Sequence, residues 1–137
     1  MPQARDIMTP APQCIGEDDS LVDAAELLVS LDVGALPICG EDNRLKGMLT
    51  DRDIVVKAVA EGADPAHTKV GRLAEGKPVT IGADDDVQDA LETMRQHQVR
   101  RLPVIDGHDL VGIVSQADVA LSLAPSDAGD TVAEISI

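Results

Sequence analysis

The 137-residue chain contains no phenylalanine, tyrosine or tryptophan. Leucine, valine, isoleucine, alanine and methionine must therefore fill its core. Proteins that bind single-stranded nucleic acid stack the bases on aromatic side chains, so this absence disfavours that class of function. A purine pocket in this chain would have to be lined by aliphatic side chains.

Basic residues are scarce as well. The chain has 11 lysine and arginine residues against 25 aspartate and glutamate residues, which gives a formal net charge of −14. Nucleic acid is a disfavoured partner, because its phosphate backbone binds basic surfaces. Seven of the eleven basic residues nevertheless fall in two short windows, which either hold a compact anion or pair with neighbouring carboxylates. They are Arg44, Lys46, Arg52 and Lys57 in one window, and Arg95, Arg100 and Arg101 in the other.

Long apolar runs are missing. The longest, such as residues 54–56, are far shorter than the ~20 residues that a membrane-spanning helix requires. The N-terminal residues also lack the apolar stretch of a signal peptide. We expect a soluble, cytoplasmic protein of one compact domain that has no membrane partner.

Motifs of catalysis are absent too. The chain has no Gly-x-Ser-x-Gly, phosphate-loop, His-Glu-x-x-His or Cys-x-x-Cys motif, and no hydroxyl or thiol nucleophile has an evident histidine partner. We therefore expect that the protein is not an enzyme and requires no cofactor.

What the chain does contain is an internal repeat. The pattern that begins with Ile-Gly at residue 15 and includes Leu-Pro at residue 36 recurs 66 positions later. After a one-residue deletion the match continues at an offset of 65, which pairs Gly-x-x-Thr-x-x-Asp ending at Asp53 with Gly-x-x-Ser-x-x-Asp ending at Asp118. Two copies of this length indicate two units that bury a shared face with pseudo-two-fold symmetry, rather than a long solenoid.

Both copies have the same predicted elements. A short β-like run comes first, followed by a helix of about three turns whose apolar residues recur at i, i+3, i+4 and i+7. Ser20 and Asp86 are the predicted N-caps of these helices, since an aspartate follows each three positions later. The apolar stripes are Leu21, Ala24, Ala25 and Leu28 in the first copy and Val87, Ala90, Leu91 and Met94 in the second.

A hairpin and a second helix complete each copy. The predicted strands are 13–15, 36–39 and 45–50 in the first copy and 79–81, 102–105 and 110–115 in the second, with the final helices at 51 to about 60 and 116 to about 123.

The order β-α-β-β-α determines the strand directions. The strand-helix-strand part requires a parallel, right-handed crossover, and the hairpin adds a third strand antiparallel to the second. We predict an α+β fold of two β-α-β-β-α repeats packed sheet to sheet. The predicted boundaries are 1–62 for the first repeat with its N-terminal segment, 63–123 for the linker and second repeat, and 124–137 for a C-terminal tail.

The two cysteines, Cys14 and Cys39, lie on strands that the crossover makes neighbours. Adjacent strands can provide the Cα separation of about 4.4–6.8 Å that a disulfide needs, whereas a cytosolic compartment keeps thiols reduced. A disulfide and a pair of buried thiols are both compatible with the sequence. A metal site is disfavoured, because two sulfurs without nearby histidine complete no tetrahedral ligand set.

The most suggestive chemistry lies where the last strand of each copy enters its last helix. Thr50 with Asp53, and Ser115 with Asp118, have the spacing of a capping box, which stabilises a helix start by roughly 1 kcal/mol. The same groups can instead hold a phosphate at the helix N-terminus and accept hydrogen bonds from ribose hydroxyls. Repetition does not separate these two interpretations, because duplication copies caps as well as sites.

Taken together, these motifs resemble a known family. The tandem Asp-Ile-Met-Thr-like openings, the Leu-Pro-Ile/Val strands and the closing Gly-x-x-[Ser/Thr]-x-x-Asp motifs are similar to a cystathionine-β-synthase (CBS) domain pair, or Bateman module. The resemblance spans residue 4 to about residue 123. It implies a stand-alone regulatory module whose clefts, between the two repeats, bind AMP, ADP, ATP or S-adenosylmethionine-like ligands.

The resemblance also implies roles for individual residues. Asp53 and Asp118 would hold ribose hydroxyls, Thr50 and Ser115 would contact phosphate, and Thr80 would line the cleft. Arg101 matches a position where the family often has a phosphate-binding base, and Arg52 and Arg100 join it as candidate nucleotide-binding residues. The copies differ here: Gly34-Ala35 stands in place of Arg100-Arg101, and Ala117 in place of Arg52, so the two clefts should not bind alike.

Members of the family commonly form homodimers through their helices, and we expect a homodimer and an unknown protein partner here. The alternative is a ligand-free CBS pair, an interaction or stress-associated protein that acts through its dimer surface and whose caps are only caps.

Overall fold

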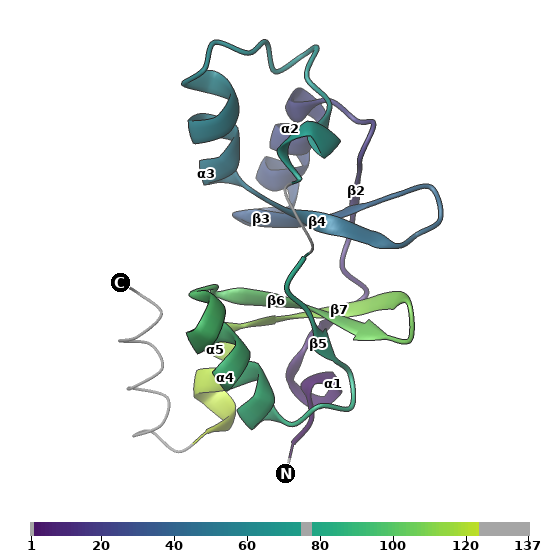
Figure 1. Cartoon of the computed structure of the whole chain (residues 1–137), viewed down its shortest axis with the longest axis vertical. Helices are drawn as coiled ribbons and strands as arrows, with labels where there is room; N and C mark the ends of the chain where they lie inside the picture. The colour runs from purple at the N-terminus through teal and green to yellow at the C-terminus, as the bar shows by residue number, and fades with distance from the viewer. Residues whose placement is uncertain (1, 75–77, 124–137) are drawn as a thin grey trace. The chain divides into compact units, whose positions relative to one another are not determined.

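The computed structural model describes residues 2–74 and 78–123, which form two compact units (Figure 1). Among these residues, 13–74 and 78 make up the first-repeat unit, and 2–12 together with 79–123 make up the second-repeat unit. The predicted tail, 124–137, lies outside the described residues.

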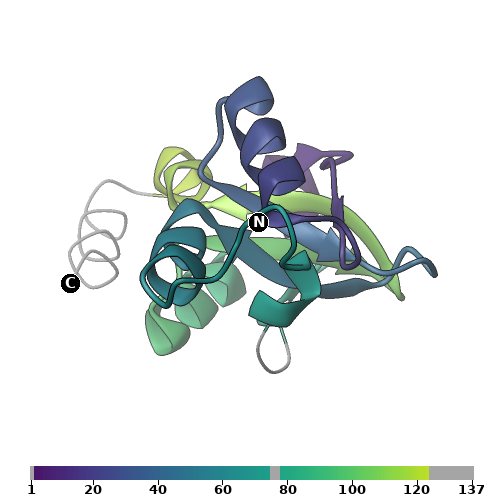
Figure 2. The same cartoon turned by 90° about the horizontal axis from the view of Figure 1, so that it is seen from above.

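The first-repeat unit contains a three-stranded sheet in the order β2-β3-β4, with strands β2 (Ile15–Gly16), β3 (Ala35–Cys39) and β4 (Leu45–Thr50). β2 is parallel to β3, and β3 is antiparallel to β4, so the predicted crossover and hairpin are confirmed. Helix α2 (Leu21–Leu31) connects β2 to β3. After β4 come helix α3 (Asp51–Ile54), a π-helical turn (Val55–Val59) and a 3-10 helix (Val70–Leu73). Figure 2 shows α2 and α3 on the same face of this sheet.

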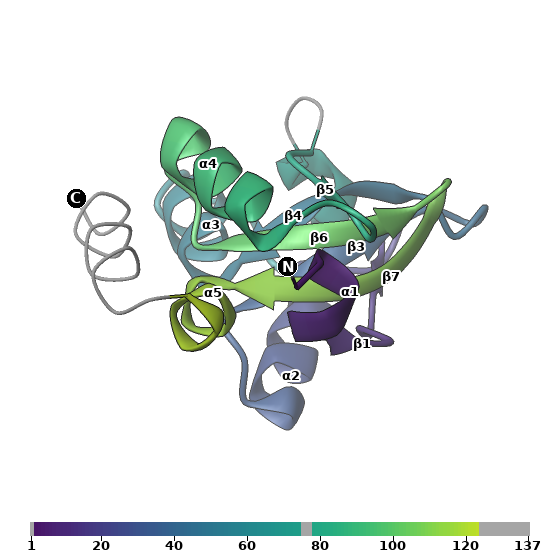
Figure 3. The same cartoon turned by 90° about the horizontal axis from the view of Figure 1, so that it is seen from below.

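The second-repeat unit has the same arrangement with one additional strand. Its sheet order is β1-β7-β6-β5, with strands β1 (Thr9–Pro10), β5 (Ile81–Gly82), β6 (Arg101–Asp106) and β7 (Asp109–Ser115). β5 is parallel to β6, and β7 is antiparallel to both β6 and β1. Helices α1 (Ala4–Ile7), α4 (Val87–His97) and α5 (Gln116–Ser122) lie over one face of the sheet (Figure 3).

The first strand of each repeat is shorter than predicted. The apolar runs at 13–15 and 79–81 contribute only their last residue to β2 and β5, which end at Gly16 and Gly82. The predicted fold class is nevertheless confirmed: both repeats are mixed β-α-β-β-α units. The packing of the two sheets against each other stays a prediction.

The starts of α2 and α4 differ although the helices are copies. The Ser20 hydroxyl accepts a hydrogen bond from the Asp23 N–H at 3.1 Å, as the capping-box pattern predicts. The predicted side-chain cap at Asp86 is wrong, because its carboxylate makes no capping hydrogen bond. The Val87 N–H at the start of α4 donates to the Pro2 carbonyl at 3.1 Å, a backbone contact that α2 also makes, at Leu21.

That contact belongs to an exchange of segments. The segment that precedes each repeat packs on the other repeat, through equivalent backbone hydrogen bonds. In the second-repeat unit they join Ala4 N to Asp85 O (2.8 Å), Arg5 N to Ala83 O (3.0 Å) and Val87 N to Pro2 O (3.1 Å). In the first-repeat unit they join Val70 N to Asp19 O (2.8 Å), Gly71 N to Glu17 O (2.8 Å) and Leu21 N to Thr68 O (3.0 Å).

An ion pair accompanies this exchange in the second-repeat unit. The Arg5 guanidinium lies 2.7 Å from the Asp84 carboxylate and 3.5 Å from that of Asp106. The hydrogen bond and the charge of Asp84 raise the pKa of Arg5. Because all three side chains are exposed, the pair orients the segment rather than contributing much stability.

The compact units therefore differ from the predicted boundaries. The prediction divided the chain at residue 62 and grouped 1–12 with the first repeat, whereas these residues pack in the second-repeat unit. Residues 63–74 were predicted to belong with the second repeat, but they pack in the first-repeat unit. The physical reason is the exchanged hydrogen bonding, which similarity between the repeats does not reveal.

Each unit has its own aliphatic core. In the first-repeat unit Leu21, Ile38 and Leu49 are fully buried, and in the second-repeat unit Val87 and Val104 are. The exchanged segments contribute equivalent buried residues to these cores: Ala4 in one unit and Val70 in the other.

Cys14 and Cys39 form a disulfide, with a Cα–Cα distance of 5.8 Å. Of the two compatible states, the structure contains the bridge and not the thiol pair. It joins the residue before β2 to the last residue of β3, and so reinforces a parallel pairing of only two residues on each strand.

Reducing this disulfide should lower the free energy of unfolding by about 3 kcal/mol, because it releases a loop between cysteines 25 positions apart in the unfolded chain. Urea unfolding followed by circular dichroism, with and without dithiothreitol, measures the difference. A Cys14→Ala/Cys39→Ala variant should be as unstable as the reduced protein and insensitive to the reductant. Equal stability of the oxidised and reduced wild type would contradict the prediction.

Removing residues 2–8 should loosen the second-repeat unit, since the start of α4 loses its hydrogen bond to the Pro2 carbonyl and the core loses Ala4. Hydrogen exchange read by mass spectrometry should show faster exchange at residues 83–97 than in the intact protein, with little change at 15–31. Val70→Ala, which opens a cavity in the other unit, is the matched control and should reverse the pattern. Faster exchange confined to 15–31 in the truncated chain would refute the exchange of segments.

Candidate functional site

Both predicted helix-start motifs form capping boxes. The Thr50 hydroxyl accepts a hydrogen bond from the Asp53 N–H at 3.0 Å, and the Thr50 N–H donates to the Asp53 carboxylate at 3.0 Å. The corresponding distances for Ser115 and Asp118 are 3.1 and 2.8 Å. One carboxylate oxygen of each aspartate therefore accepts a capping hydrogen bond, and the other oxygen takes no part in the cap.

The second carboxylate oxygen distinguishes the two motifs. Oδ1 of Asp53 lies 3.4 Å from the Lys57 ammonium, one helical turn later. The equivalent of Lys57 in the second repeat is Ser122, which donates to the Val119 carbonyl instead. Within the described residues Oδ1 of Asp118 has no hydrogen-bond or ion-pair partner. Of the two aspartates, Asp118 is therefore the one whose Oδ1 is available to accept a hydrogen bond from a ligand.

Positive charge gathers at the same helix start. Arg101 is the register partner of Ser115 in the β6–β7 hairpin, and the Gln116 N–H donates to the Arg100 carbonyl at 2.8 Å. Both arginines are exposed. In the first repeat Ala35 pairs with Thr50 in the same way, and the Asp51 N–H donates to the Gly34 carbonyl at 3.0 Å. The backbones are thus equivalent, but only the second repeat has arginines at these two positions, where the first repeat has Gly34 and Ala35.

Gln116, the first residue of α5, is a candidate that the motif analysis missed. Its side-chain Oε1 is buried and has no hydrogen-bond partner in the described part of the chain. Asp51 occupies the equivalent position in the first repeat. The first repeat thus has a carboxylate where the second has an amide, and this difference between the copies could have identified the position from the sequence.

The structure brings together four of the eight predicted nucleotide-binding residues: Arg100, Arg101, Ser115 and Asp118. Thr80 belongs to the same unit and is exposed immediately before β5, the strand beside β6. Thr50, Arg52 and Asp53 lie at the start of α3 in the first-repeat unit, where Arg52 is exposed. The predicted set therefore divides into two groups on different units.

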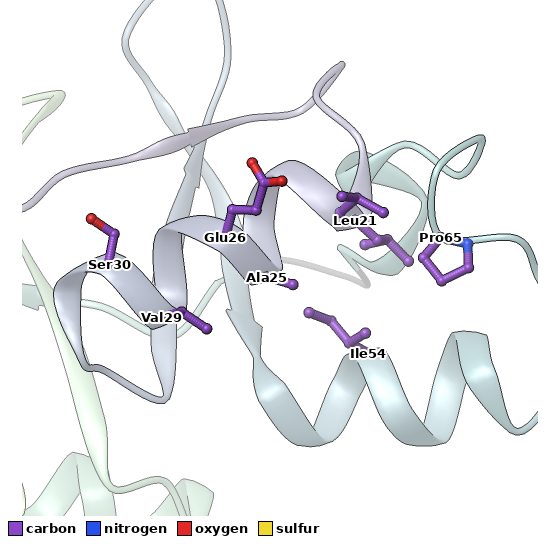
Figure 4. A pocket seen from close by; sticks show the side chains of 8 residues that line it. Leu21, Ala25, Glu26, Val29, Ser30, Ile54 and Pro65 are labelled. Carbon is purple, nitrogen blue, oxygen red and sulfur yellow. The ribbon is translucent and has the colours of Figure 1, made fainter.

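Two pockets lie within the first-repeat unit, and neither includes a predicted nucleotide-binding residue. An apolar groove of about 470 Å³ runs between α2 and Ile54 of α3 and ends at Pro65 (Figure 4). A second hollow of about 420 Å³ is lined by Cys14 and by the carboxylates of Asp19, Asp23 and Glu26.

The groove also corrects the predicted core. Ala25 was placed on the buried stripe of α2, but it is exposed in the groove, whereas its counterpart Leu91 is only 5% exposed. The small side chain does not reach the neighbouring helix, which leaves the groove open.

Two properties of the described residues bear on the expected partners. No group of three or more His, Cys, Asp or Glu side chains is placed to hold a metal ion. None of the helices in residues 2–74 and 78–123 has the length and apolar character needed to cross a bilayer.

Both copies of the repeat match a known protein family. A model of the CBS domain matches the chain twice, at residues 4–59 and 70–124. The chain belongs to the CBS-domain family. A pair of CBS domains is a regulatory module, so the resemblance drawn from the sequence motifs is confirmed at this level.

Two curated relatives are matched over most of their own length. The chain is 50% identical over 123 residues to hypoxic response protein 1 of Mycobacterium tuberculosis, covering 90% of this chain and 86% of the relative. It is 36% identical over 137 residues to the CBS domain-containing protein YhcV of Bacillus subtilis, covering 99% and 96% of the two chains.

Solved CBS-domain structures share the fold. The crystal structure of hypoxic response protein I with two coordinated zinc ions matches with a TM-score of 0.84 and 50% identity, over 90% of this chain and all of the other. The crystal structure of CBSX2 in complex with AMP matches with a TM-score of 0.75 and 27% identity, over 88% and 94% of the two chains.

The Ser115 cap should contribute to stability whether or not a ligand binds. Ser115→Ala should lower the free energy of unfolding by about 1 kcal/mol, because the Asp118 N–H loses its acceptor. Chemical unfolding without ligand measures this loss. Ser115→Thr keeps a hydroxyl and should retain most of the stability, whereas an alanine variant as stable as the wild type would contradict the observed cap.

Proposed function

We propose that this CBS pair is a regulatory module that binds an adenosine-containing ligand, such as AMP, ADP, ATP or a similar molecule of the S-adenosylmethionine type. The observation that carries the proposal is the grouping of Arg100 and Arg101 with the α5 helix start, on an otherwise acidic protein. The complex of CBSX2 with AMP supports the ligand class.

The chemistry of the group matches the parts of a nucleotide. Two guanidinium groups attract phosphate oxygens through charge-assisted, bidentate hydrogen bonds. The available oxygen of Asp118 can accept from a ribose hydroxyl while its other oxygen continues to cap the helix. Oε1 of Gln116 is a further acceptor, and the exposed Thr80 lies immediately before β5, the strand beside β6.

The first repeat is the weaker candidate for binding. Its Thr50 and Asp53 are engaged in the cap and with Lys57, and Gly34-Ala35 provide no charge. Arg52 is the one arginine that remains there among the predicted binding residues. We propose that affinity resides mainly in the second repeat.

The finer parts of the proposal concern how such a module acts. The protein catalyses no reaction, requires no cofactor, acts in the cytoplasm as a homodimer and passes its ligand state to a protein partner. CBS-domain relatives that are regulatory rather than catalytic support this view.

A second candidate function rests on the capping geometry. The hydroxyls of Thr50 and Ser115, and one carboxylate oxygen of the aspartate in each motif, all accept capping hydrogen bonds. Helix capping therefore explains both motifs without a ligand. The protein would then be a ligand-free CBS pair that acts through its surface alone.

Thermal unfolding with AMP, ADP, ATP and S-adenosylmethionine tests the proposal. A ligand present at 100 times its dissociation constant should add about 2.7 kcal/mol to the free energy of unfolding. In isothermal titration, Arg100→Ala/Arg101→Ala should raise the dissociation constant at least about tenfold, because charge-assisted hydrogen bonds are lost.

Arg52→Ala is the matched control, since it removes an exposed arginine from the other helix start, and it should leave the affinity nearly unchanged. If none of the four ligands changes the melting temperature, nucleotide binding is refuted and the ligand-free alternative stands. If binding survives unchanged in the double variant, the ligand class holds but the site does not.

A further inference from the structure

The disulfide belongs to the first repeat alone. At the positions of its two cysteines the second repeat has Thr80 and Ile105. β5 nevertheless pairs with β6 in the same parallel register in which β2 pairs with β3. The parallel pairing therefore forms without a disulfide, and the bond is an addition that neither the fold nor the candidate nucleotide site explains.

The two sulfur atoms of the bond differ in accessibility. Cys14 is half-buried and lines the hollow of about 420 Å³, whereas Cys39 is only 7% exposed and is not part of that lining. A disulfide opens when a thiolate attacks one of its sulfurs, and access decides which sulfur is attacked. The hollow therefore leads a small thiol to Cys14 Sγ, with Cys39 as the leaving group.

The charge of this hollow restricts which thiols reach the sulfur. Its lining has the three carboxylates of Asp19, Asp23 and Glu26 and, within the described residues, no lysine or arginine. Asp19 accepts a hydrogen bond from the Gly16 N–H at 2.9 Å. Asp23 accepts one from the Ser20 N–H at 3.2 Å. Because charges held in place in a concavity attract ions of opposite sign and repel ions of like sign, this acidic hollow favours cationic and neutral thiols over anionic ones.

The bond also lies beside a place of segment exchange. The Glu17 N–H donates to the Cys39 carbonyl at 3.2 Å, and the Glu17 carbonyl accepts from the Gly71 N–H at 2.8 Å. The turn at residues 16–19 thus connects the disulfide-bonded strands to the segment that precedes the second repeat. Since β2 and β3 pair at only two residues each, opening the bond should loosen this turn and the docking of residues 68–71.

We propose that the Cys14–Cys39 disulfide is a site of thiol–disulfide exchange that cationic and neutral thiols reach through the acidic hollow, from which anionic thiols are repelled. A thiolate attacks Cys14 Sγ, the S–S bond breaks, and Cys39 leaves with the bonding electron pair and takes up a proton from water. A second thiolate attacks the sulfur of the bound small thiol, which releases the Cys14 thiolate and a small-molecule disulfide. The protein gains two electrons, and the two small thiols supply them.

This selectivity determines which reductants leave the bond intact. Glutathione, the thiol that keeps cytosolic cysteines reduced, is an anion, so the acidic hollow slows its access to Cys14. The proposal is independent of nucleotide binding, because it uses other residues and needs no nucleotide.

Reduction by three small thiols of different charge tests the proposal: cysteamine, a cation, 2-mercaptoethanol, which is neutral, and 3-mercaptopropionate, an anion. Acid quenching, alkylation and intact-mass measurement give the rate per thiolate for the folded protein and for the protein unfolded in urea, which has no hollow. The preference for cysteamine over 3-mercaptopropionate should be at least about tenfold greater in the folded protein, and 2-mercaptoethanol should react at an intermediate rate. Added salt should reduce the preference, because ions screen the carboxylates. An equal preference in the folded and unfolded protein would overturn the proposal.

Peptide mapping after a brief reaction with cysteamine identifies the attacked sulfur. The cysteamine adduct should be found on Cys14 and the free thiol at Cys39. The reverse assignment would contradict attack through the acidic hollow.

Glu26→Gln removes one charge from the hollow and should lower the preference of the folded protein for cysteamine at least about twofold. Glu92→Gln is the matched control, because it makes the same change at the equivalent position of the second repeat. It should leave the preference unchanged. Equal effects of the two variants would assign the selectivity to the net charge of the protein and refute the role of the hollow.

Hydrogen exchange tests the effect of opening the bond. The reduced protein should exchange faster than the oxidised protein at residues 16–19 and 68–71. Exchange should stay the same at residues 82–85, the matching turn of the second repeat. Unchanged exchange at 68–71 would refute the link between the disulfide and the exchanged segment.

Discussion

The structure depends on the exchange of the segments that precede the two repeats. Backbone hydrogen bonds from residues 2–5 complete the second repeat, and bonds from residues 68–71 complete the first. Buried N–H and C=O groups need partners, so neither repeat is complete without the segment before the other. Ala4 and Val70 extend the same dependence into the two cores. The connectivity of the chain therefore links the two repeats, because each one is completed by the segment that precedes the other.

On this common backbone the functional differences arise from a few side chains. Both helix starts carry the same capping box, and both strands approach it in the same register. Arg100-Arg101 stand against Gly34-Ala35, Ser122 stands against Lys57, and Ala117 stands against Arg52. The first difference adds positive charge at one helix start, and the second leaves an oxygen of Asp118 available. Function thus belongs to the site and not to the fold.

The two repeats differ in the features that could serve a function. The second repeat has the cations and the acceptors suited to a nucleotide, and its helix face is polar. The first repeat has the largely apolar, open groove between α2 and α3. Duplication allows such a division, because one copy can keep a feature that the other loses while both keep their caps and cores. A regulatory module needs both a ligand site and a surface that transmits its state.

The amino-acid sequence by itself determined the repeat, the β-α-β-β-α order, the strand directions and three of the four predicted caps. These follow from local spacing and from the handedness of the crossover, which short stretches of chain specify. Only the tertiary structure decided the exchange of segments, the state of Cys14 and Cys39, the pairing of Arg101 with Ser115 and the exposure of Ala25. Each of these depends on which distant segments pack together, and one periodic pattern is compatible with several such packings. Ala25 illustrates the reason: its position on the helix indicates the buried side, but burial depends on what packs over that position, and in the first repeat Ala25 lines an open groove.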